Sequence, residues 1–389
     1  MPYSIPYILF IACLLVVSAM QLGFRWSERT LRITNIVVMA GFVFFFGGRW
    51  LIGWDWINYY EAFEKAVPIQ QFMAHHNWQF NEPGYNLWMC LIRTFTKKYW
   101  IFVFASTLLN AILLHIFFSR FLEPKYYALG MAVFLVVYGF TLATDLMRNF
   151  TGLLIFCLAL PYIEQRKWYL FFPLVALGCM FHWSIAVLAV CYFFLHLRIP
   201  LAIWMGVFVV SNIIFLAGLP SISLVFRGIA AFFPQEQREL MIGYVQNAIY
   251  GKQYGLSLGY LERTGICFFV LFYYDKLIKE KSSNILFINA FFIFVLICLL
   301  CYEFNIFITR FGILFAFGCW IIYPKLLNHL DKALRPIYWL VLAVIIVIKM
   351  HTMSGNILYN YENVFVNERV STYERRCEIF YDNRTKLMK

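Results

Sequence analysis

The chain has 389 residues, of which 62% are hydrophobic and only 13% are charged, against roughly 25% charged residues in an ordinary soluble domain. Its mean hydropathy is +0.72, and 21% of its residues are aromatic. This composition excludes soluble, fibrous, disordered and disulfide-stapled proteins and indicates a polytopic membrane protein. Its apolar runs are continuous rather than alternating, which excludes a β-barrel. The net charge of +12 is typical of positively charged cytoplasmic loops rather than of a nucleic-acid-binding surface.

The apolar runs predict an all-α polytopic fold with about twelve transmembrane helices, because a helix satisfies its own backbone hydrogen bonds within lipid. The predicted spans are 5–24, 33–52, 99–119, 126–143, 149–163, 168–181, 183–197, 200–218, 260–275, 285–302, 306–323 and 335–352. A further apolar stretch at 84–96 is too short to cross. We predict that it is an amphipathic helix lying at the outer interface.

Clusters of Lys and Arg follow every second span, which places these junctions in the cytoplasm and both ends of the chain outside. The clusters are Arg25 with Arg29 and Arg32, Arg120 with Lys125, Arg166 with Lys167, Arg198, Lys276 with Lys279 and Lys281, and Lys325 with Lys332 and Arg335. We predict one integral membrane domain over 1–352 and a C-terminal tail, 353–389, on the outer face. Two long outer segments, 53–98 and 219–259, are candidates for function because of their length.

Ionisable side chains gather near the predicted outer ends of the helices, where proximity to lipid makes each of them costly. Ordinary loops would place such groups on both faces about equally, so the one-sided cluster indicates a functional site. Its members are Arg49, Asp55, Glu82, Asp145, Arg148, His182, Glu303 and Arg310.

Each candidate also has a structural interpretation. Arg49 suits an interfacial anchor whose aliphatic stem lies in lipid. Asp55 suits a cap on a short helix over 56–66. Asp145 and Arg148 suit a local ion pair at the start of a helix.

The other candidates have similar alternatives. Glu82 can pair with a nearby lysine, His182 can lie between packed helices, and Glu303 can be a solvent-facing charge. Pro83 favours the first position of a helix, which places Glu82 at a helix N-terminus whose dipole stabilises the ionised carboxylate.

Several arginines, a carboxylate and a histidine at one membrane face are suited to a lipid-linked diphosphate sugar. Arginine binds phosphate in a bidentate manner, and a carboxylate or histidine can deprotonate a hydroxyl group. The chain has no phosphate-binding P-loop and no dinucleotide-binding glycine motif. The adjacent His75 and His76 have poor spacing for a metal site, so neither a metal nor a cofactor is expected.

At these residues the chain resembles the EpsG family, a branch of the Wzy-like bacterial polysaccharide polymerases. The resemblance rests on R-W-L-I-G-W-D-W-I-N-Y-Y at 49–60, F-N-E-P-G-Y at 80–85, D-L-M-R-N at 145–149, G-C-M-F-H-W-S at 178–184 and T-R-F at 309–311. Asn149 departs from the pattern, because a glutamine is expected after Arg148.

The resemblance implies a glycosyltransferase similar to the C-type enzymes. It would join oligosaccharide repeat units carried on undecaprenyl diphosphate at the outer face of the bacterial cytoplasmic membrane. Its partners would be the lipid-linked donor and acceptor, membrane lipid and a chain-length regulator, with no nucleic acid.

The resemblance also implies roles for the candidate residues. Glu82 or Asp55 would be the base that deprotonates the acceptor hydroxyl, and His182 would orient the acceptor or share the proton transfer. The residues grouped as substrate and diphosphate contacts are Arg49, Arg148, Arg310, Tyr59, Asp145 and Glu303. Arg148 and Arg310 are expected to face one cavity.

Other classes of protein share some of these features. A flippase for lipid-linked oligosaccharides would carry charges along a path through both leaflets and show two related halves, whereas the charges here are one-sided and no repeat is visible. A membrane O-acyltransferase would need a histidine reached from the cytoplasmic side. A structural assembly partner is a further alternative.

Overall fold

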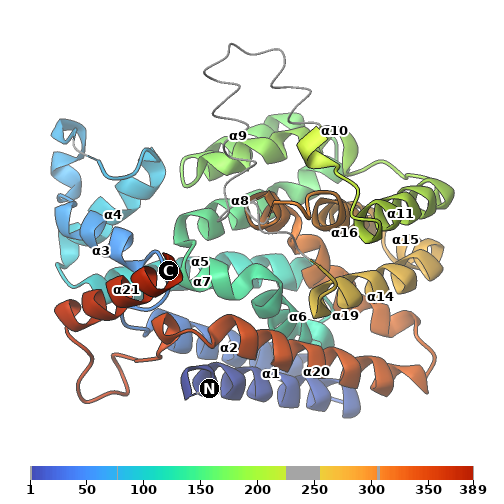
Figure 1. Cartoon of the computed structure of the whole chain (residues 1–389), viewed down its shortest axis with the longest axis horizontal. Helices are drawn as coiled ribbons and strands as arrows, with labels where there is room; N and C mark the ends of the chain where they lie inside the picture. Colours follow the sequence, from blue (N-terminus) through green and yellow to red (C-terminus); the bar gives the residue numbers. More distant parts are fainter. Residues whose placement is uncertain (1, 77, 225–254, 305–306, 389) are drawn as a thin grey trace. The chain divides into compact units, whose positions relative to one another are not determined.

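Every regular element that the computed structural model describes is a helix. The described residues are 2–76, 78–224, 255–304 and 307–388 (Figure 1). Most of the predicted outer segment 219–259 falls on 225–254 and so lies outside them. One isolated antiparallel bridge joins Arg49 and Asn363. The chain divides into two compact units, Met1–Tyr192 with Ile337–Lys389 and Phe193–Pro336.

Five described helical segments are long and apolar enough to cross a membrane. They are Ile5–Gly23, Glu28–Gly47, Tyr99–Phe121, Pro124–Thr144 and Leu334–Ser354. A pair bent by 52°, Ile308–Phe315 with Phe317–His329, makes up to six. The all-helical membrane fold is therefore confirmed, whereas twelve spans are not.

Several predicted spans form helices that are too short by themselves. The shorter apolar helices are Trp168–Cys179, Trp183–Phe194, Leu201–Leu216 and Asn284–Leu300. At roughly 1.5 Å per residue, a helix of 12 residues covers about 18 Å of a hydrocarbon core about 30 Å thick. The predicted span 183–197 also begins as a 3-10 helix, η6 (Trp183–Val190), because apolarity alone does not distinguish one helix type from another.

The first unit begins with a helical hairpin. It comprises α1 (Ile5–Gly23) and α2 (Glu28–Phe42), and α2 continues as the π-helix η2 (Val43–Gly47). The helix α20 (Leu334–Ser354) runs antiparallel beside α1 (Figure 1). Hydrogen bonds join Ser4 to His351 at one end of this pair and Trp339 to Ser18 at the other. The N-terminus of α1 and the C-terminus of α20 therefore lie at the same end of the unit.

The predicted outer segment 53–98 folds into three short helices. They are α3 (Trp56–Lys65), η3 (Ile69–Ala74) and α4 (Pro83–Phe95), and α4 covers the stretch predicted as an interfacial helix. A chain of helical pieces follows: α5 (Tyr99–Phe121), η4 (Pro124–Tyr126), α6 (Tyr127–Phe134), η5 (Leu135–Gly139) and α7 (Phe140–Thr144).

The helix α8 (Met147–Glu164) is the buried centre of the first unit, with apolar side chains on all its faces. It packs against α5 and α9 (Trp168–Cys179), which is followed by η6 and α10 (Cys191–Phe194). A Cβ on Gly152 of α8 would lie 2.9 Å from the carbonyl oxygen of Gly178 on α9. This close contact brings the start of α8 beside the end of α9.

The C-terminal tail completes the first unit with η8 (Ile357–Tyr359) and α21 (Tyr373–Met388). The backbone N–H groups of Trp50 and Gly53 donate to the carbonyl oxygens of Glu362 and Leu358, respectively, and Val364 donates to Gly48. The tail therefore packs on the segment 48–53, which carries the first sequence motif.

The second unit contains α11 (Leu201–Leu216), α14 (Leu258–Phe272), α15 (Tyr274–Glu280), α16 (Asn284–Leu300), η7 (Ile308–Gly312), α18 (Ile313–Phe315) and α19 (Phe317–His329). The helices α16 and α19 approach closely at Gly318, where a Cβ would lie 2.5 Å from the backbone nitrogen of Phe291. Lys325, predicted as a loop charge, is instead buried on α19 and donates to Asn284 at 2.6 Å.

Candidate functional site

A partly buried ion pair joins two of the motifs. Arg148, in the first turn of α8, contacts the Glu82 carboxylate with 2.6 Å between Nη1 and Oε2. Glu82 is the N-cap residue of α4, and only 5% of its surface is exposed. Its side chain makes no capping hydrogen bond to α4. The expected helix N-terminus at Glu82 is present, but the nearest cation is an arginine 66 residues along the chain rather than a nearby lysine.

The residues after Glu82 bring a third motif to this pair. Pro83 occupies the start of α4, and the backbone N–H groups of Gly84 and Tyr85 both donate to the carbonyl oxygen of Met180. A Cβ on Gly84 would lie 2.8 Å from the Cβ of Met180, so a larger residue would force the two segments apart. The motifs at 80–85 and 178–184 are therefore in direct contact.

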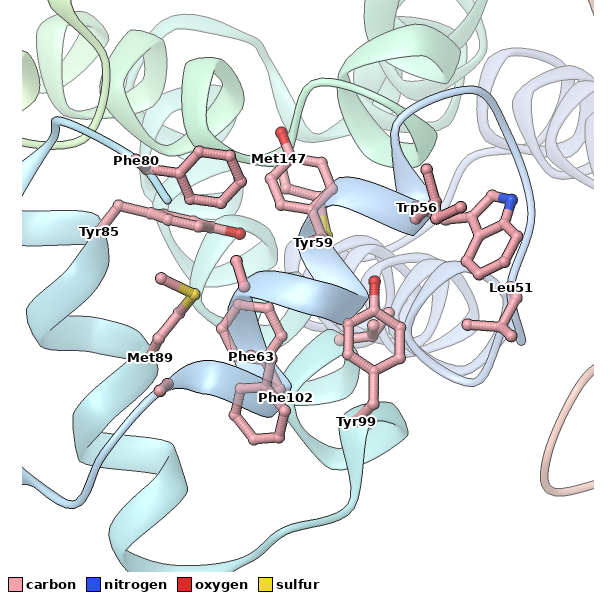
Figure 2. Close-up of a cluster of buried hydrophobic side chains, with 14 of the residues drawn as sticks. Leu51, Trp56, Tyr59, Phe63, Phe80, Tyr85, Met89, Tyr99, Phe102 and Met147 are labelled. Atoms are coloured by element: carbon pink, nitrogen blue, oxygen red, sulfur yellow. The ribbon is translucent and has the colours of Figure 1, made fainter. Parts of the chain in front are cut away.

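Aromatic rings surround the ion pair. The guanidinium carbon of Arg148 lies 3.9 Å from the centre of the Phe80 ring, and Phe80 packs against Tyr59 and Tyr85. Figure 2 shows these three rings together, close to Met147 at the start of α8. Burial raises the pKa of the Tyr59 phenol to about 12, although the charge of Arg148 lowers it in part. Tyr59 therefore keeps its proton at neutral pH and cannot act as a base.

Two buried polar atoms of this cluster have no hydrogen-bond partner among the described residues. They are Nε of Arg148 and the hydroxyl oxygen of Tyr85. An unsatisfied buried polar group is costly, so each of these atoms is a candidate to bond to a ligand oxygen. The side chain of Arg148 remains 22% exposed, which leaves the guanidinium accessible to such a ligand.

His182 lies beside the start of α8 through a chain of hydrogen bonds. Its Nδ1 accepts from the backbone N–H of Ser184 at 3.2 Å and lies 2.7 Å from the Ser184 hydroxyl. That hydroxyl accepts from the Asn149 side chain at 3.2 Å. Because a backbone N–H can only donate, Nδ1 of a neutral His182 is an acceptor and the proton is on Nε2. Asn149, the departure from the family pattern, is therefore part of the site.

Asp145 holds the backbone of the first motif. Its carboxylate accepts from the backbone N–H of Trp54, the Thr144 hydroxyl and the Tyr359 hydroxyl. Gly53 has a φ of +95°, and a Cβ there would lie 2.2 Å from a carboxylate oxygen of Asp145. Burial raises the pKa of Asp145, and these hydrogen bonds lower it in part. The hydrogen bonds described for Asp145 are thus internal, and the alternative of a local pair with Arg148 is not found.

Arg49 is a buried connector rather than an anchor exposed to lipid. Only 4% of its surface is exposed. It donates to the carbonyl oxygens of Phe46 and Thr144, to the Thr107 hydroxyl and to the Met147 sulfur. These contacts tie the end of η2 to α5 and to the junction of α7 with α8. Arg49 therefore holds the elements beside the site together and has a structural role.

Three further candidates are Asp55, Glu303 and Arg310. Asp55 is the N-cap residue of α3 and makes no side-chain capping hydrogen bond. In the second unit, the buried Glu303 accepts from the backbone N–H groups of Ser221 and Ser223, so it is not a plain solvent-facing charge. Arg310 is exposed on η7 of the same unit.

The first unit thus brings together Arg49, Tyr59, Glu82, Asp145, Arg148 and His182 at one end of its helices. Sequence reasoning missed Phe80, Tyr85, Ser184 and Tyr359 as neighbours of these residues. Phe80, Tyr85 and Ser184 lie inside the quoted motifs, so motif membership was an available signal. Tyr359 lies in the tail, which carries no such signal.

The fold and this site define an integral, all-helical membrane protein with a polar cluster at the ends of its helices. A family model of the EpsG family matches residues 32–364, and the chain belongs to this family. The match extends from α2 into the tail and includes all five motifs. It identifies the chain as a polysaccharide-related membrane protein. No curated protein and no solved structure matches the chain.

Proposed function

We propose that the chain is a polymerase that joins oligosaccharide repeat units carried on undecaprenyl diphosphate. The observation that supports this most directly is the partly buried Glu82–Arg148 pair, whose neighbour Asn149 is linked to His182 through Ser184. It combines a phosphate-binding guanidinium with a carboxylate that can accept a proton. Membership of the EpsG family supports the connection with polysaccharide. The reaction would take place at the outer face of the bacterial cytoplasmic membrane.

The reaction is a glycosyl transfer between two lipid-linked molecules. A hydroxyl oxygen of the incoming unit attacks the anomeric carbon of the growing chain, and its proton passes to a carboxylate. The bond between that carbon and the diphosphate oxygen breaks, and undecaprenyl diphosphate leaves with the bonding electron pair. Arg148 stabilises the negative charge that develops on the leaving group.

The ion pair offers a way to couple donor binding to activation of the base. Glu82 is occupied by Arg148 in the structure, at 2.6 Å. A diphosphate that binds Arg148 would replace the carboxylate as its partner. Glu82 would then be released from its cation and could accept the proton of the acceptor hydroxyl. The base would become active only when the donor is present.

His182 fits an orienting role in this proposal. Its Nδ1 accepts from Ser184, so the proton of a neutral His182 is on Nε2. Asp55 remains the reserve candidate for the base. Arg310, in the second unit, is proposed from its motif as a second cation for the diphosphate.

A deletion strain tests the function directly. Loss of a polymerase should leave single repeat units on the lipid carrier, whereas loss of a flippase should leave them facing the cytoplasm. Complementation with Glu82→Gln keeps the shape and removes the proton acceptor. We expect polymer to fall by about 10²–10⁴-fold while the purified variant still binds the lipid-linked unit.

The matched control is Glu64→Gln. Glu64 lies in a half-exposed ion pair with Arg93 at 3.6 Å on the same outer segment. Such a pair contributes only about 0–1 kcal/mol, so normal polymer is expected. If Glu82→Gln made normal polymer and Asp55→Asn made none, the role of the base would be assigned to Asp55. Normal polymer from both variants would contradict carboxylate catalysis by this segment.

A further inference from the structure

An apolar groove runs along the first unit between two helices that can cross a membrane. Its volume is about 650 Å³, and α2 and α5 form its walls. The lining residues Ile36 on α2, Phe44 on η2, and Leu108 and Ile112 on α5 are among the exposed apolar side chains of these helices. The groove is therefore open at the outer surface of these helices. Its apolar walls suit a hydrocarbon chain.

A polar pocket continues this groove at one end. Its volume is about 360 Å³, and it shares Ile36 and His115 with the groove. Arg32, Asn35 and Ser119 add polar groups to its lining. Arg32 is exposed and only loosely paired with Glu28, at 3.9 Å, so its guanidinium is accessible to a further anion.

The floor of the polar pocket is fixed by an internal network. Asn35 donates to the carbonyl oxygen of Pro124 and accepts from Gln21 at 2.7 Å, and Gln21 accepts from the backbone of Ala128. His115 bonds to the Tyr127 hydroxyl at 2.7 Å. These contacts join α1, α2, α5 and α6. The pocket is therefore a preformed feature of the fold.

Aromatic rings occupy the opposite end of the groove. Phe365 of the tail stacks on Phe44 and meets Trp100 and Phe104 edge to face. A polar headgroup is therefore unfavourable there, and the open polar end is the one beside Arg32. From Ile36 to Phe44 the groove spans eight helical steps, or about 12 Å at roughly 1.5 Å per residue. One leaflet contributes about half of a hydrocarbon core about 30 Å thick.

We propose that this groove and pocket form a binding site for one anionic phospholipid. Its phosphate lies beside Arg32, and an acyl chain follows α2 and α5 toward Phe365. The positive-loop pattern assigns Arg32 to the cytoplasmic side, so the lipid belongs to the inner leaflet. The polyprenyl chain of a lipid-linked sugar fits less well, because its diphosphate would have to lie at the end opposite the Glu82–Arg148 pair. The proposal is independent of the polymerase activity.

Binding of defined lipids to the purified full-length protein tests this site. Phosphatidylglycerol and phosphatidylcholine are titrated separately, and bound lipid is counted by native mass spectrometry. We expect phosphatidylglycerol to bind roughly tenfold more tightly, because a guanidinium–phosphate contact is a charge-assisted hydrogen bond. Arg32→Gln should abolish this preference. Arg29→Gln, at an exposed arginine outside the pocket, should retain it.

A second pair of variants tests the groove. Ala40 lines the groove and is exposed, so Ala40→Trp should fill it and weaken binding of phosphatidylglycerol roughly tenfold. Val37→Trp, on an exposed position of the same helix outside the groove, should have no effect. The proposal would be overturned if the Arg32→Gln variant still preferred phosphatidylglycerol. It would also be overturned if the Ala40→Trp variant bound phosphatidylglycerol as tightly as the wild type. Displacement of phosphatidylglycerol by undecaprenyl phosphate at equal concentration would overturn it too, since the groove would then be a substrate site.

Discussion

Two arginines near the start of α8 have different environments. Arg49 is enclosed and donates to backbone and side-chain acceptors of the protein itself. Arg148 has one carboxylate partner, a ring beneath it and an Nε without a partner among the described residues. The same side chain therefore serves the fold at one position and is available to a ligand at the other.

Substitution by lysine should separate these two roles. A lysine keeps the charge but loses the planar fork that makes several directed hydrogen bonds. Arg49→Lys should cost about 1–3 kcal/mol of stability, since buried acceptors lose their donors. Arg148→Lys should leave the unfolding temperature near that of the wild type and reduce polymer by roughly tenfold or more. Thermal unfolding in detergent and glycan analysis measure the two effects. Equal loss of stability in both variants would contradict this assignment.

Gly53 is a residue whose backbone conformation requires glycine. Its φ of +95° is strained for other residues, and a Cβ would collide with Asp145. We expect Gly53→Ala to cost about 1–3 kcal/mol and to release the hydrogen bond from the Trp54 backbone to Asp145.

Gly218→Ala is the matched control for this prediction. Its φ is +63°, but a Cβ there would meet no atom within 4 Å. It should therefore lower the unfolding temperature less than Gly53→Ala does. If the two substitutions lowered the unfolding temperature equally, the contact between the added Cβ and Asp145 would not contribute to the loss of stability.

At the scale of elements, α8 and α9 meet through two glycines as well as through side chains such as Phe156 and Phe171. Gly152 and Gly178 let the two backbones touch, and the contact aligns Arg148 on one helix with His182 just after the other. The geometry of the site therefore depends on the spacing between these two helices as much as on the polar residues themselves.

Gly152→Ala should disturb this spacing. The added Cβ would lie 2.9 Å from the Gly178 carbonyl oxygen and 2.9 Å from Cγ1 of Ile185. Overpacking of this kind typically costs about 1–3 kcal/mol. We expect less polymer and a lower unfolding temperature together. Ile185→Val in the same chain should restore little, because the backbone oxygen of Gly178 remains in place. Full rescue would contradict the backbone contact.

Local sequence signals were sufficient to predict the position of several helices. Proline at the helix start predicts α4, and continuous apolar runs predict α1 and α5 to within two residues at each end. Long-range contacts could not be predicted in this way. Glu82 and Arg148 are 66 residues apart, and Asp145 and Tyr359 are 214 residues apart. No periodicity links such positions, so the sequence could name individual candidate residues but not the pairs that they form.

At the scale of the whole molecule, the charge pattern predicts the orientation in the membrane. It predicts that Gln70 is outside and Lys332 inside, and both residues are exposed. In a cysteine-free background, Gln70→Cys should react with a membrane-impermeant thiol reagent in intact cells. Lys332→Cys should react only after permeabilisation. The reverse result would invert the topology and contradict an outward-facing site.

The tail that packs on residues 48–53 has a consequence for the timing of synthesis. Tyr359 bonds to Asp145, and the Trp50 indole donates to the carbonyl oxygen of Ser371, so the first motif is held by residues that are synthesised much later. Chains grow at roughly 5–20 residues per second and fold from the N-terminus. The first motif and Asp145 therefore lack these hydrogen bonds until the tail has been synthesised.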